Sequence, residues 1–532
     1  MPGIDTPTPL DIPNPDGPFP EPFPFPGFEL PRKWDRPVWD HIRWGPATLR
    51  ILVVSDGSSY DTSPFGFSLG FALADMSNIA HPDHPSYARF AFTKAHRTTD
   101  TGVTAGFENF RFNPGSLDGF DEVWLFGYTP GAPYLSPQEV QVIEAFMDAG
   151  GGVLAMGDHE DLGLGLCGGI KRVRSMRKWW FDSPAPPAGM LRAPDSTDLT
   201  RNDTQQPPLP GSQSDAIAQP IYPNYRYAWP YWRPWWRRQK YPHPILCGPR
   251  GAITVFPDHA HEGDCILPDP AFAGEFPGGV AVEVIARGRN VVGREKGGFV
   301  ISDPRAFGLL GVWDGHAASG GTPGRVVVDA TWHHWFNVNL TGLRTAGGDT
   351  YADILAVFRN IAIWLAPKGK QAAMRRAGTR ILLLTPSLVE HVAVLRDWRP
   401  ATWYWLGIEA RDALGRIAPQ CQSAAWFDWV VSPALDVAFR KFALNDRYEG
   451  AHTLVESAVI EAASATAFGA AINALAIEVN KRGFEAIGEL DEEIDKIAIA
   501  GARRGLAEAA EQLSRSSGIF EALGKARSAK AD

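Results

Sequence analysis

The stretch LSPQEVQVIEAFMDAGGGVLAMGDHED, residues Leu135–Asp161, decides the fold expected for this chain. A helix is predicted over 136–149, because Ser136 suits the N-cap position, a proline follows it, and Glu139 completes a capping box. The apolar run around Val153 is typical of a buried strand. In an α/β sheet, the loop at the carboxyl end of such a strand is where ligands bind. The polar residues after this strand are therefore expected to form a functional site.

Similar elements are predicted on both sides of this stretch. Apolar, β-branched runs predict strands at Leu49–Gly57 and Phe120–Tyr128, and Ser63–Met76 predicts a helix between them. Because strands and helices alternate, we predict an α/β fold with a doubly wound parallel sheet. Further sheet segments and one closing helix are predicted, in that order, at 251–256, 280–288, 297–303, 324–335 and 349–367.

The composition divides the chain into three parts. Residues 1–46 form a proline-rich arm, which is expected either to pack along a surface or to be a disordered tail. Residues 47–368 hold the α/β domain, with an insertion rich in Trp and Pro at about 162–249. Residues 369–532 are Ala-rich and have helical periodicity, so we predict an all-α domain used for assembly or docking.

Bulk properties narrow the class of protein. The net charge of -9 and pI of 5.8 argue against a nucleic-acid binder. The four cysteines form no CxxC pair, so a cysteine zinc site is not expected, and their scarcity fits a reducing compartment. We expect neither a signal peptide nor a membrane span, since no apolar run of ~18 residues is apparent. The expected location is the cytoplasm.

Histidines and carboxylates gather where strands are predicted to end. Imidazole and carboxylate groups together bind zinc, iron or manganese, or act without metal as a general base and acid. The structural alternative is that each histidine only hydrogen-bonds a backbone carbonyl. The catalytic candidates are Asp158, His159, Glu160, His316 and His333. The candidate ligands for a divalent metal are His159, His259, His261 and His333.

Spacing refines these candidates. His259 and His261 would share one face of an extended strand, a spacing that can chelate a metal. His333 and His334 are adjacent, so on a strand they would point to opposite faces and at most one would reach the site. We favour His333.

The aromatic stretch 222–244 supplies candidates for substrate binding. Trp beside Arg suits sugar rings and anionic groups. A structural lid or a subunit contact is the alternative, since these residue types are also enriched at interfaces. The candidate substrate-binding residues are Trp229, Trp232 and Arg233, with Asp56 at the end of the first strand lining the pocket.

The order RILVVSDG, FDEVWLFG, LSPQEVQVIEAFMDAGGGVLAMGDHED and GRVVVDATWHHW, with a closing helix, resembles the class I glutamine amidotransferase-like superfamily. It looks most like the ThuA-like (trehalose-utilisation) branch, which lacks a working Cys elbow. The resemblance covers roughly 47–368 and implies a flavodoxin-like sheet with its site at the Gly157–Asp161 turn. At the position where the superfamily has its nucleophile elbow, the turn that carries the catalytic cysteine, this chain has Met156–His159 and no cysteine. Cys167 follows about ten residues later, so thiolate glutaminase chemistry is not expected.

Two functions follow from these patterns. The first is a hydrolase that acts on a carbohydrate or an amide-containing small molecule through the His/Asp/Glu site, with or without a divalent metal. The second is a non-catalytic structural or assembly protein built on an inactive amidotransferase-like scaffold. In either case we expect a homo-oligomer formed through the C-terminal helical domain.

Overall fold

The structure is a computed structural model, and residues 44–532 belong to one compact unit of it. The prediction of a proline-rich arm falls on 1–46, which lies outside the described residues except for Pro46. The structure describes residues 46–99, 106–130, 133–159, 161–179, 216–227, 240–258, 262–289, 295–296, 299–300, 306–385, 388, 400–431, 433, 454–483 and 490–528.

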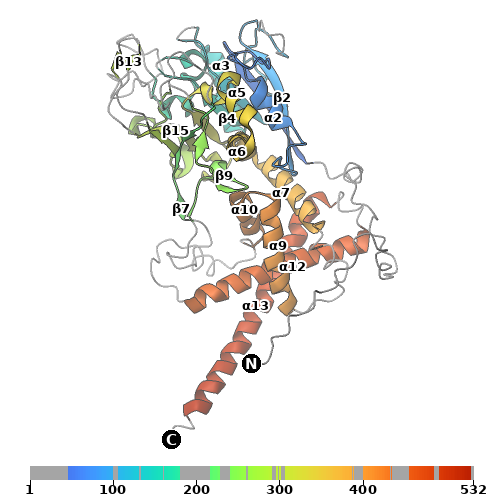
Figure 1. Ribbon diagram of the computed structural model, residues 1–532. Coiled ribbons are helices and arrows are strands. Elements are labelled where there is room, and N and C mark those ends of the chain that lie inside the picture. The colour runs from blue at the N-terminus through green and yellow to red at the C-terminus, as the bar shows by residue number, and fades with distance from the viewer. Residues whose placement is uncertain are drawn as a thin grey trace, which may run out of the picture. The chain divides into compact units, whose positions relative to one another are not determined.

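An eight-stranded, mostly parallel sheet forms the centre of the α/β part (Figure 1). Its strand order is β2-β1-β3-β4-β16-β15-β12-β6. The parallel strands are β1 (Ala47–Ser55), β2 (Ala88–His96), β3 (Glu122–Phe126), β4 (Gly152–Met156) and β16 (Val326–Asp329). The antiparallel strands are β15 (Ala306–Trp313), β12 (Glu283–Arg289) and β6 (Tyr222–Pro223).

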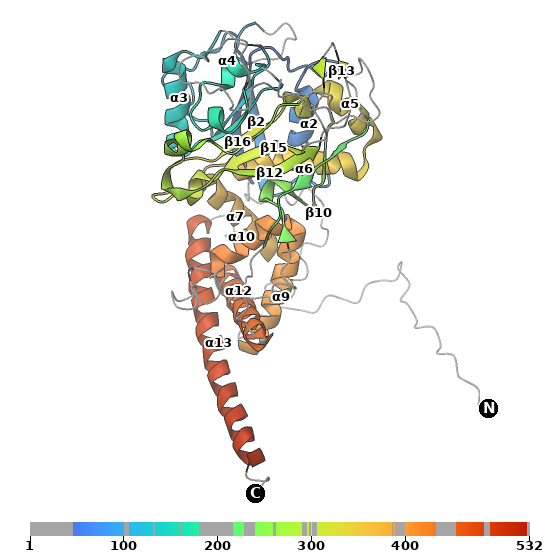
Figure 2. The ribbon, with the colours of Figure 1, turned by 90° about the vertical axis from the view of Figure 1, so that its left-hand side faces the viewer.

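The prediction of an α/β fold is confirmed, but the prediction of a purely parallel sheet is wrong at one edge. Figure 2 shows β16, β15 and β12 side by side, and here the chain reverses direction at each step. Parallel neighbours need a crossover connection, whereas antiparallel neighbours can be joined by a short one. The connection from β15 to β16 spans only 314–325, which is too short for a crossover helix.

Some predicted segments differ in extent. The segment 251–256 forms only the two-residue strands β10 (Gly251–Ala252) and β11 (Val255–Phe256), and 280–288 corresponds to β12. Of 297–303, the described part is β14 (Phe299–Val300). The strands β2 and β15 were not predicted at all. Both mix polar or glycine residues into an apolar pattern, which weakens the pattern expected of a strand.

Helix α3 (Pro137–Asp148) confirms the prediction made from its capping box. The Ser136 side chain accepts a hydrogen bond from the Glu139 amide, and the Glu139 carboxylate accepts one from the Ser136 amide. Helix α2 (Gly70–Ser77) begins later than the predicted 63–76, because Ser68 pairs with Ser59 in an isolated bridge just before it.

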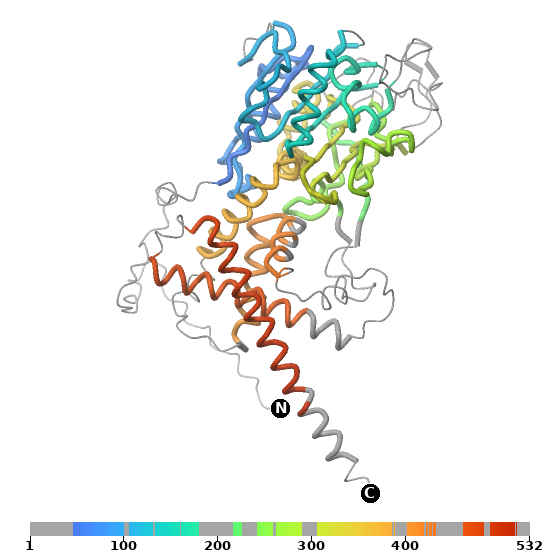
Figure 3. The backbone as a smooth tube through the Cα atoms, turned by 180° about the vertical axis from the view of Figure 1, so that it is seen from behind, coloured from blue at the N-terminus to red at the C-terminus, as the bar shows by residue number. Residues whose placement is uncertain are grey.

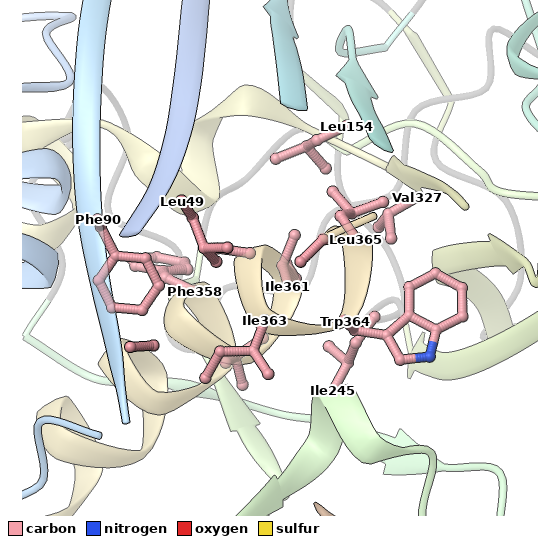
Figure 4. Packing of buried hydrophobic residues seen from close by; sticks show 14 of the residues in the cluster. Leu49, Phe90, Leu154, Ile245, Val327, Phe358, Ile361, Ile363, Trp364 and Leu365 are labelled. Carbon is pink, nitrogen blue, oxygen red and sulfur yellow. The ribbon is translucent and has the colours of Figure 1, made fainter. Parts of the chain in front are cut away.

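Helices α5 (Asn337–Ala346) and α6 (Gly348–Leu365) follow the last strand. Ile361 and Leu365 of α6 lie among sheet residues such as Leu154 (Figure 4). All three are buried, and burying each such side chain stabilises the fold by about 1.5–3 kcal/mol. The helix therefore fixes β4 and β16 against each other.

The C-terminal region is all-helical in its described residues, as predicted. In Figure 3 its two longest helices cross one another. The helices are α7 (Lys368–Leu383), α9 (Pro400–Ile417), α10 (Gln420–Val431), α12 (Leu454–Arg482) and α13 (Asp491–Ser528). One stretch, Glu461–Arg482, is long and apolar enough to cross a membrane, which the sequence analysis did not expect. It is 78% buried in the protein, as a core helix would be, so it is weak evidence for a membrane span.

Short elements connect these parts. The short helices are α4 (Leu164–Cys167), η1 (Val173–Ser175), η3 (Pro244–Leu246), η4 (Pro270–Glu275), η5 (Pro277–Gly279), η6 (Gly315–Ala317) and η7 (Trp332–Trp335). The remaining short strands are β5 (Gln219–Pro220), β7 (Arg226–Tyr227), β8 (Lys240–Tyr241), β9 (Cys247–Gly248) and β13 (Glu295–Lys296).

Candidate functional site

Two loops meet at the carboxyl edge of the parallel strands. Met156 at the end of β4 pairs with Asp329 at the end of β16. The loop after β4 carries Asp158, and the loop after β16 leads into η7, which carries His333. Because the two strands are parallel and adjacent, both loops begin at the same place on the edge.

A buried carboxylate holds a partly exposed imidazole at this edge. Asp158 Oδ2 lies 2.7 Å from His159 Nδ1. Asp158 is 1% exposed, whereas the His159 side chain is 17% exposed. Arg177 donates hydrogen bonds to the carbonyl oxygens of Asp158 and Ala330, and so ties the two loops together. The arrangement orients the His159 ring and leaves it within reach of solvent.

Asp158 is ionised at neutral pH. Its burial opposes ionisation, but the positive field of His159 and its hydrogen bond outweigh that cost and lower the pKa of Asp158 to about 2. A carboxylate in this state stabilises a positive charge on His159 when that ring takes up a proton.

His333 is the second imidazole of the site. Its Nε2 lies 3.7 Å from Asp158 Oδ2, and its Nδ1 lies 2.9 Å from Asn339 Oδ1. The amide oxygen can only accept, so Nδ1 carries the proton. Burial lowers the pKa of His333 to about 4, and the ring is therefore neutral at physiological pH.

Aromatic rings flank His333 on one side. Trp332 lies 3.9 Å from the His333 ring and Phe67 lies 5.8 Å from it, both measured between ring centroids. Tyr128 and Phe336 pack against Trp332 at 4.9 Å and 4.7 Å. Phe67 is 37% exposed, so the cluster presents an apolar ring surface beside the acidic and basic groups.

His334 has a different environment from its neighbour. Its Nδ1 lies 2.7 Å from Asp329 Oδ1 and its Nε2 lies 3.5 Å from Glu262 Oε2. Gln219 also donates a hydrogen bond to the Glu262 carboxylate. Burial disfavours the charged ring, but the two carboxylates prevail and raise the pKa of His334 to about 10. The four side chains form a buried, hydrogen-bonded cluster around a charged His334 ring.

The expectation that His333 and His334 lie on a strand, and so point to opposite faces, is wrong. The expected strand over 324–335 ends at Asp329, and both histidines lie in the 3-10 helix η7. They separate because a short helical turn, rather than strand alternation, directs successive side chains apart.

His316 does not join the other candidates. It follows β15, whose last residue, Trp313, pairs with Val326 at the start of β16. His316 therefore lies at the amino edge, opposite Asp158. Burial, reinforced by Arg325, lowers its pKa to about 3.

Asp56 lies at the carboxyl edge, but its carboxylate is already engaged. It accepts hydrogen bonds from the Tyr128 amide (2.6 Å) and from the Thr129 amide and hydroxyl (3.2 and 2.6 Å). It therefore joins the end of β1 to the end of β3. Cys167 is fully buried, and burial raises the pKa of its thiol to about 12, which does not suit a nucleophile.

Several candidates lie outside the described residues, and their proposed roles stay predictions: Glu160, Trp229, Trp232, Arg233, His259 and His261. Among the described residues no group of three or more His, Cys, Asp or Glu could hold a metal ion. Of the described candidates, Asp158, His159 and His333 lie together at the carboxyl edge of the sheet.

Sequence reasoning missed the residues that position this group. Asn339 of helix α5 holds His333, and Arg177 holds the Asp158 loop. Their partners are backbone or side-chain atoms distant in sequence. No local spacing pattern marks either residue.

Comparisons with known proteins give little further information. No family model matches the chain, and no curated protein matches it. One similar solved structure is a cytoplasmic protein from Salmonella typhimurium, with 11% identity and a TM-score of 0.28, covering 60% of this chain and 100% of that one. A similarity this low carries no argument about function.

Proposed function

We propose that the protein is a hydrolase that uses His159, oriented by Asp158, as a general base and acid. The observation that carries the proposal is the 2.7 Å contact between the buried Asp158 carboxylate and the His159 ring at the carboxyl edge of the sheet. A buried carboxylate on Nδ1 fixes the ring and stabilises its charged form, as in other acid–base dyads.

The strand order supports this location. The five parallel strands follow the order β2-β1-β3-β4-β16, which is the 2-1-3-4-5 order of flavodoxin-like sheets. In such sheets ligands bind beyond the carboxyl ends of the strands. The order also agrees with the resemblance to amidotransferase-like proteins of the ThuA-like branch, in which we propose to place the fold.

In the proposed reaction, His159 takes a proton from a water molecule through Nε2. The hydroxyl oxygen bonds to the carbonyl carbon of an amide, and the C–N bond then breaks. The imidazolium returns the proton to the leaving nitrogen, so the products are a carboxylic acid and an amine. Asp158 stays ionised throughout and stabilises the imidazolium. The same pair could serve a glycosidic bond, so the substrate class is an amide-containing small molecule or a carbohydrate.

The aromatic cluster favours a substrate with a flat apolar face. Phe67, whose ring centroid lies 5.8 Å from that of His333, is 37% exposed and presents ring surface beside this histidine, and the buried Trp332 packs behind both rings. Stacking of a sugar or another ring on such residues contributes to binding and orientation.

The test is a screen of the purified protein against amide and glycoside substrates, followed by kinetics of variants. We expect His159→Ala to lower kcat/KM at least 100-fold, since a positioned general base contributes about 10²–10⁴-fold. His316→Ala is the matched control, because that histidine lies at the opposite edge, and it should retain the wild-type rate. Wild-type turnover in His159→Ala would overturn the proposal.

Treatment with a chelator distinguishes acid–base hydrolysis without a metal from hydrolysis at a divalent metal. The proposed mechanism needs no metal, so activity should survive chelation. Loss of activity on chelation, restored by zinc, iron or manganese, would instead support a metal centre that includes His159 and His333. A protein without turnover on any substrate of the screen, but with a defined assembly, would favour the scaffold function.

A further inference from the structure

The loop between β1 and α2 brings Phe67 beside the proposed active site. A β-turn precedes this residue, since the Gly66 amide donates a hydrogen bond to the Ser63 carbonyl at 3.3 Å. The Phe67 ring centroid lies 5.8 Å from that of His333. His333 Nε2 in turn lies 3.7 Å from Asp158 Oδ2. A single side chain, His333, therefore links Phe67 to the carboxylate of the dyad.

Helix α5 holds this loop in place through its first turn. The Asn337 amide donates to the Ser68 carbonyl at 2.7 Å. The Val338 amide donates to the Gly66 carbonyl at 3.3 Å. The Asn337 side chain also donates to the Asp61 carbonyl at 3.0 Å. Because the first amides of a helix have no acceptor within the helix, these contacts satisfy the helix and fix the loop at the same time.

The same helix turn fixes the histidine beside the loop. Asn339, two residues after Asn337, accepts a hydrogen bond from His333 Nδ1 at 2.9 Å. One rigid element thus sets the position of Phe67 relative to His333.

Ring contacts orient Phe67 itself. Its ring meets those of Trp332, His333 and Phe336 at interplanar angles of 89°, 68° and 71°, with centroids 5.8–6.0 Å apart. This is the edge-to-face arrangement that aromatic rings favour. Phe67 nevertheless stays 37% exposed. A ring that is held in place before a ligand arrives loses little conformational entropy on binding, so this open surface is suited to recognition.

Polar side chains of the loop and of α5 are engaged with the loop backbone or with each other. The Asp61 carboxylate accepts from the Ser59 hydroxyl at 2.8 Å and from the Ser63 amide at 2.7 Å. The Ser68 and Thr341 hydroxyls donate to backbone carbonyls of the same loop. Sugar hydroxyls lose hydrogen bonds to water on binding and need protein partners in return, whereas an apolar ring needs only ring surface. The loop therefore favours an apolar ring over a sugar.

We propose that Phe67 selects an amide substrate that carries a planar apolar ring, in preference to a carbohydrate. The proposal rests on the proposed function, in which His159 acts on the amide bond. Water adds to the amide carbonyl carbon, the C–N bond breaks, and the leaving nitrogen takes up the proton, so the products are a carboxylic acid and an amine. Phe67 contacts the ring of the substrate and takes no part in these steps. It is a specificity-determining residue.

Two pairs of amides test this assignment in kinetics on the full chain. The pairs are 4-phenylbutanamide against butanamide, with the ring on the acyl side, and N-(3-phenylpropyl)acetamide against N-propylacetamide, with the ring on the amine side. We expect kcat/KM at least tenfold higher for the ring-bearing member of at least one pair. The difference should lie mainly in KM, since the ring contact is made in the ground state and in the transition state alike. Phe67→Ala should lower this preference at least fivefold, and Phe67→Trp should retain it.

The matched control is Phe65→Ala. Phe65 belongs to the same loop and is 73% exposed, but it forms no ring contact with the described residues, so this variant should keep the wild-type preference. N-acetylglucosamine, an amide carried by a sugar, should be a poorer substrate than the preferred ring-bearing amide. Equal turnover within both pairs, an unchanged preference in Phe67→Ala, or a higher kcat/KM for N-acetylglucosamine would overturn the proposal while leaving the hydrolase function intact.

A binding measurement separates this proposal from the proposed function. Ligand-observed NMR gives the dissociation constants of the four amides for His159→Ala, in which turnover is slowed. If the wild type hydrolyses none of the amides, the proposed function fails. Tighter binding of a ring-bearing amide, lost in Phe67→Ala, would then still assign the ring site to Phe67. Equal dissociation constants within both pairs would overturn the ring site itself.

Discussion

At the scale of single residues, neighbouring histidines acquire opposite charge states from their surroundings. His333 is buried against a neutral amide and stays neutral, whereas His334 lies between two carboxylates and stays charged. Both rings are buried, and burial disfavours the charged form of each. The partners therefore decide the outcome, and only the tertiary structure supplies them.

These charge states predict separate titrations. In histidine-selective NMR, we expect the His334 ring to keep its imidazolium shifts up to about pH 9, because its pKa is raised to about 10. The His333 ring should stay neutral down to about pH 5, because its pKa is lowered to about 4. Loss of one resonance in each His→Gln variant assigns the signals. A His334 ring that titrates near its ordinary value of 6.5 would contradict the structure of the buried cluster.

The same shift predicts how stability depends on pH. The folded pKa of His334, about 10, exceeds the ordinary value of 6.5. Its stabilisation is therefore fully present below pH 6.5 and is lost as the pH rises toward 10. We expect the thermal midpoint of the wild type to fall over this window. A midpoint that does not change between pH 7 and pH 9.5 would show that the cluster does not stabilise the fold through this charge.

At the scale of elements, one close helix contact among the described residues of the C-terminal region depends on two glycines. A Cβ on Gly407 of α9 would lie 1.9 Å from the Ala465 carbonyl oxygen, and a Cβ on Gly469 of α12 would lie 1.8 Å from the Trp403 carbonyl oxygen. At these two positions the backbones of α9 and α12 therefore lie too close together to leave room for a Cβ atom.

This close approach predicts that Gly469→Ala destabilises the helical region by about 1–3 kcal/mol, the range found for overpacking. Gly415→Ala is the matched control on α9, since nothing lies within 4 Å of its Cβ. In the control, removal of a helical glycine should stabilise by about 0.5–1 kcal/mol. Thermal unfolding followed by circular dichroism measures both effects. Equal midpoints for the two variants would contradict the packing described.

The success of sequence prediction also differs between elements. The α3 and β4 pair was predictable because a capping box and an apolar run are local patterns. The strand β15 was not predictable in this way. Its antiparallel pairing with β16, a later segment of the chain, leaves no local pattern in the sequence. In the site, the place of Asp158 could be predicted because it follows the apolar run of β4. His333 was expected inside a strand that ends earlier, at Asp329, and the position of His316 required the direction of β15.

At the scale of the whole molecule, the exposed part of α13 is where we expect a second copy to bind. From Ala510 to Gly518 the described side chains are mostly exposed, and Leu513 is an apolar residue among them. This part of the helix is not covered by the described chain itself. We therefore expect the predicted homo-oligomer to form through this exposed part of α13.

Light scattering coupled to size-exclusion chromatography measures the oligomeric state of the protein. We expect a mass that is a multiple of 58.1 kDa for the wild type and a shift toward 58.1 kDa for Leu513→Glu. Leu267→Glu is the control, since Leu267 is an exposed leucine outside the helical region. A monomeric wild type would refute the prediction, and an unchanged oligomer in Leu513→Glu would place the contact elsewhere.

The central place of β16 has a consequence for synthesis of the protein. Strand β4 ends at Met156, but its neighbour β16 begins at Val326, so the ribosome must make everything between them before the two can pair. At about 5–20 residues per second, the nascent chain carries an unpaired edge of β4 for roughly 10–30 seconds. An unpaired apolar edge recruits other strands. Nascent chains stalled before Val326 should therefore depend on chaperones for solubility, while chains released after α6 should not.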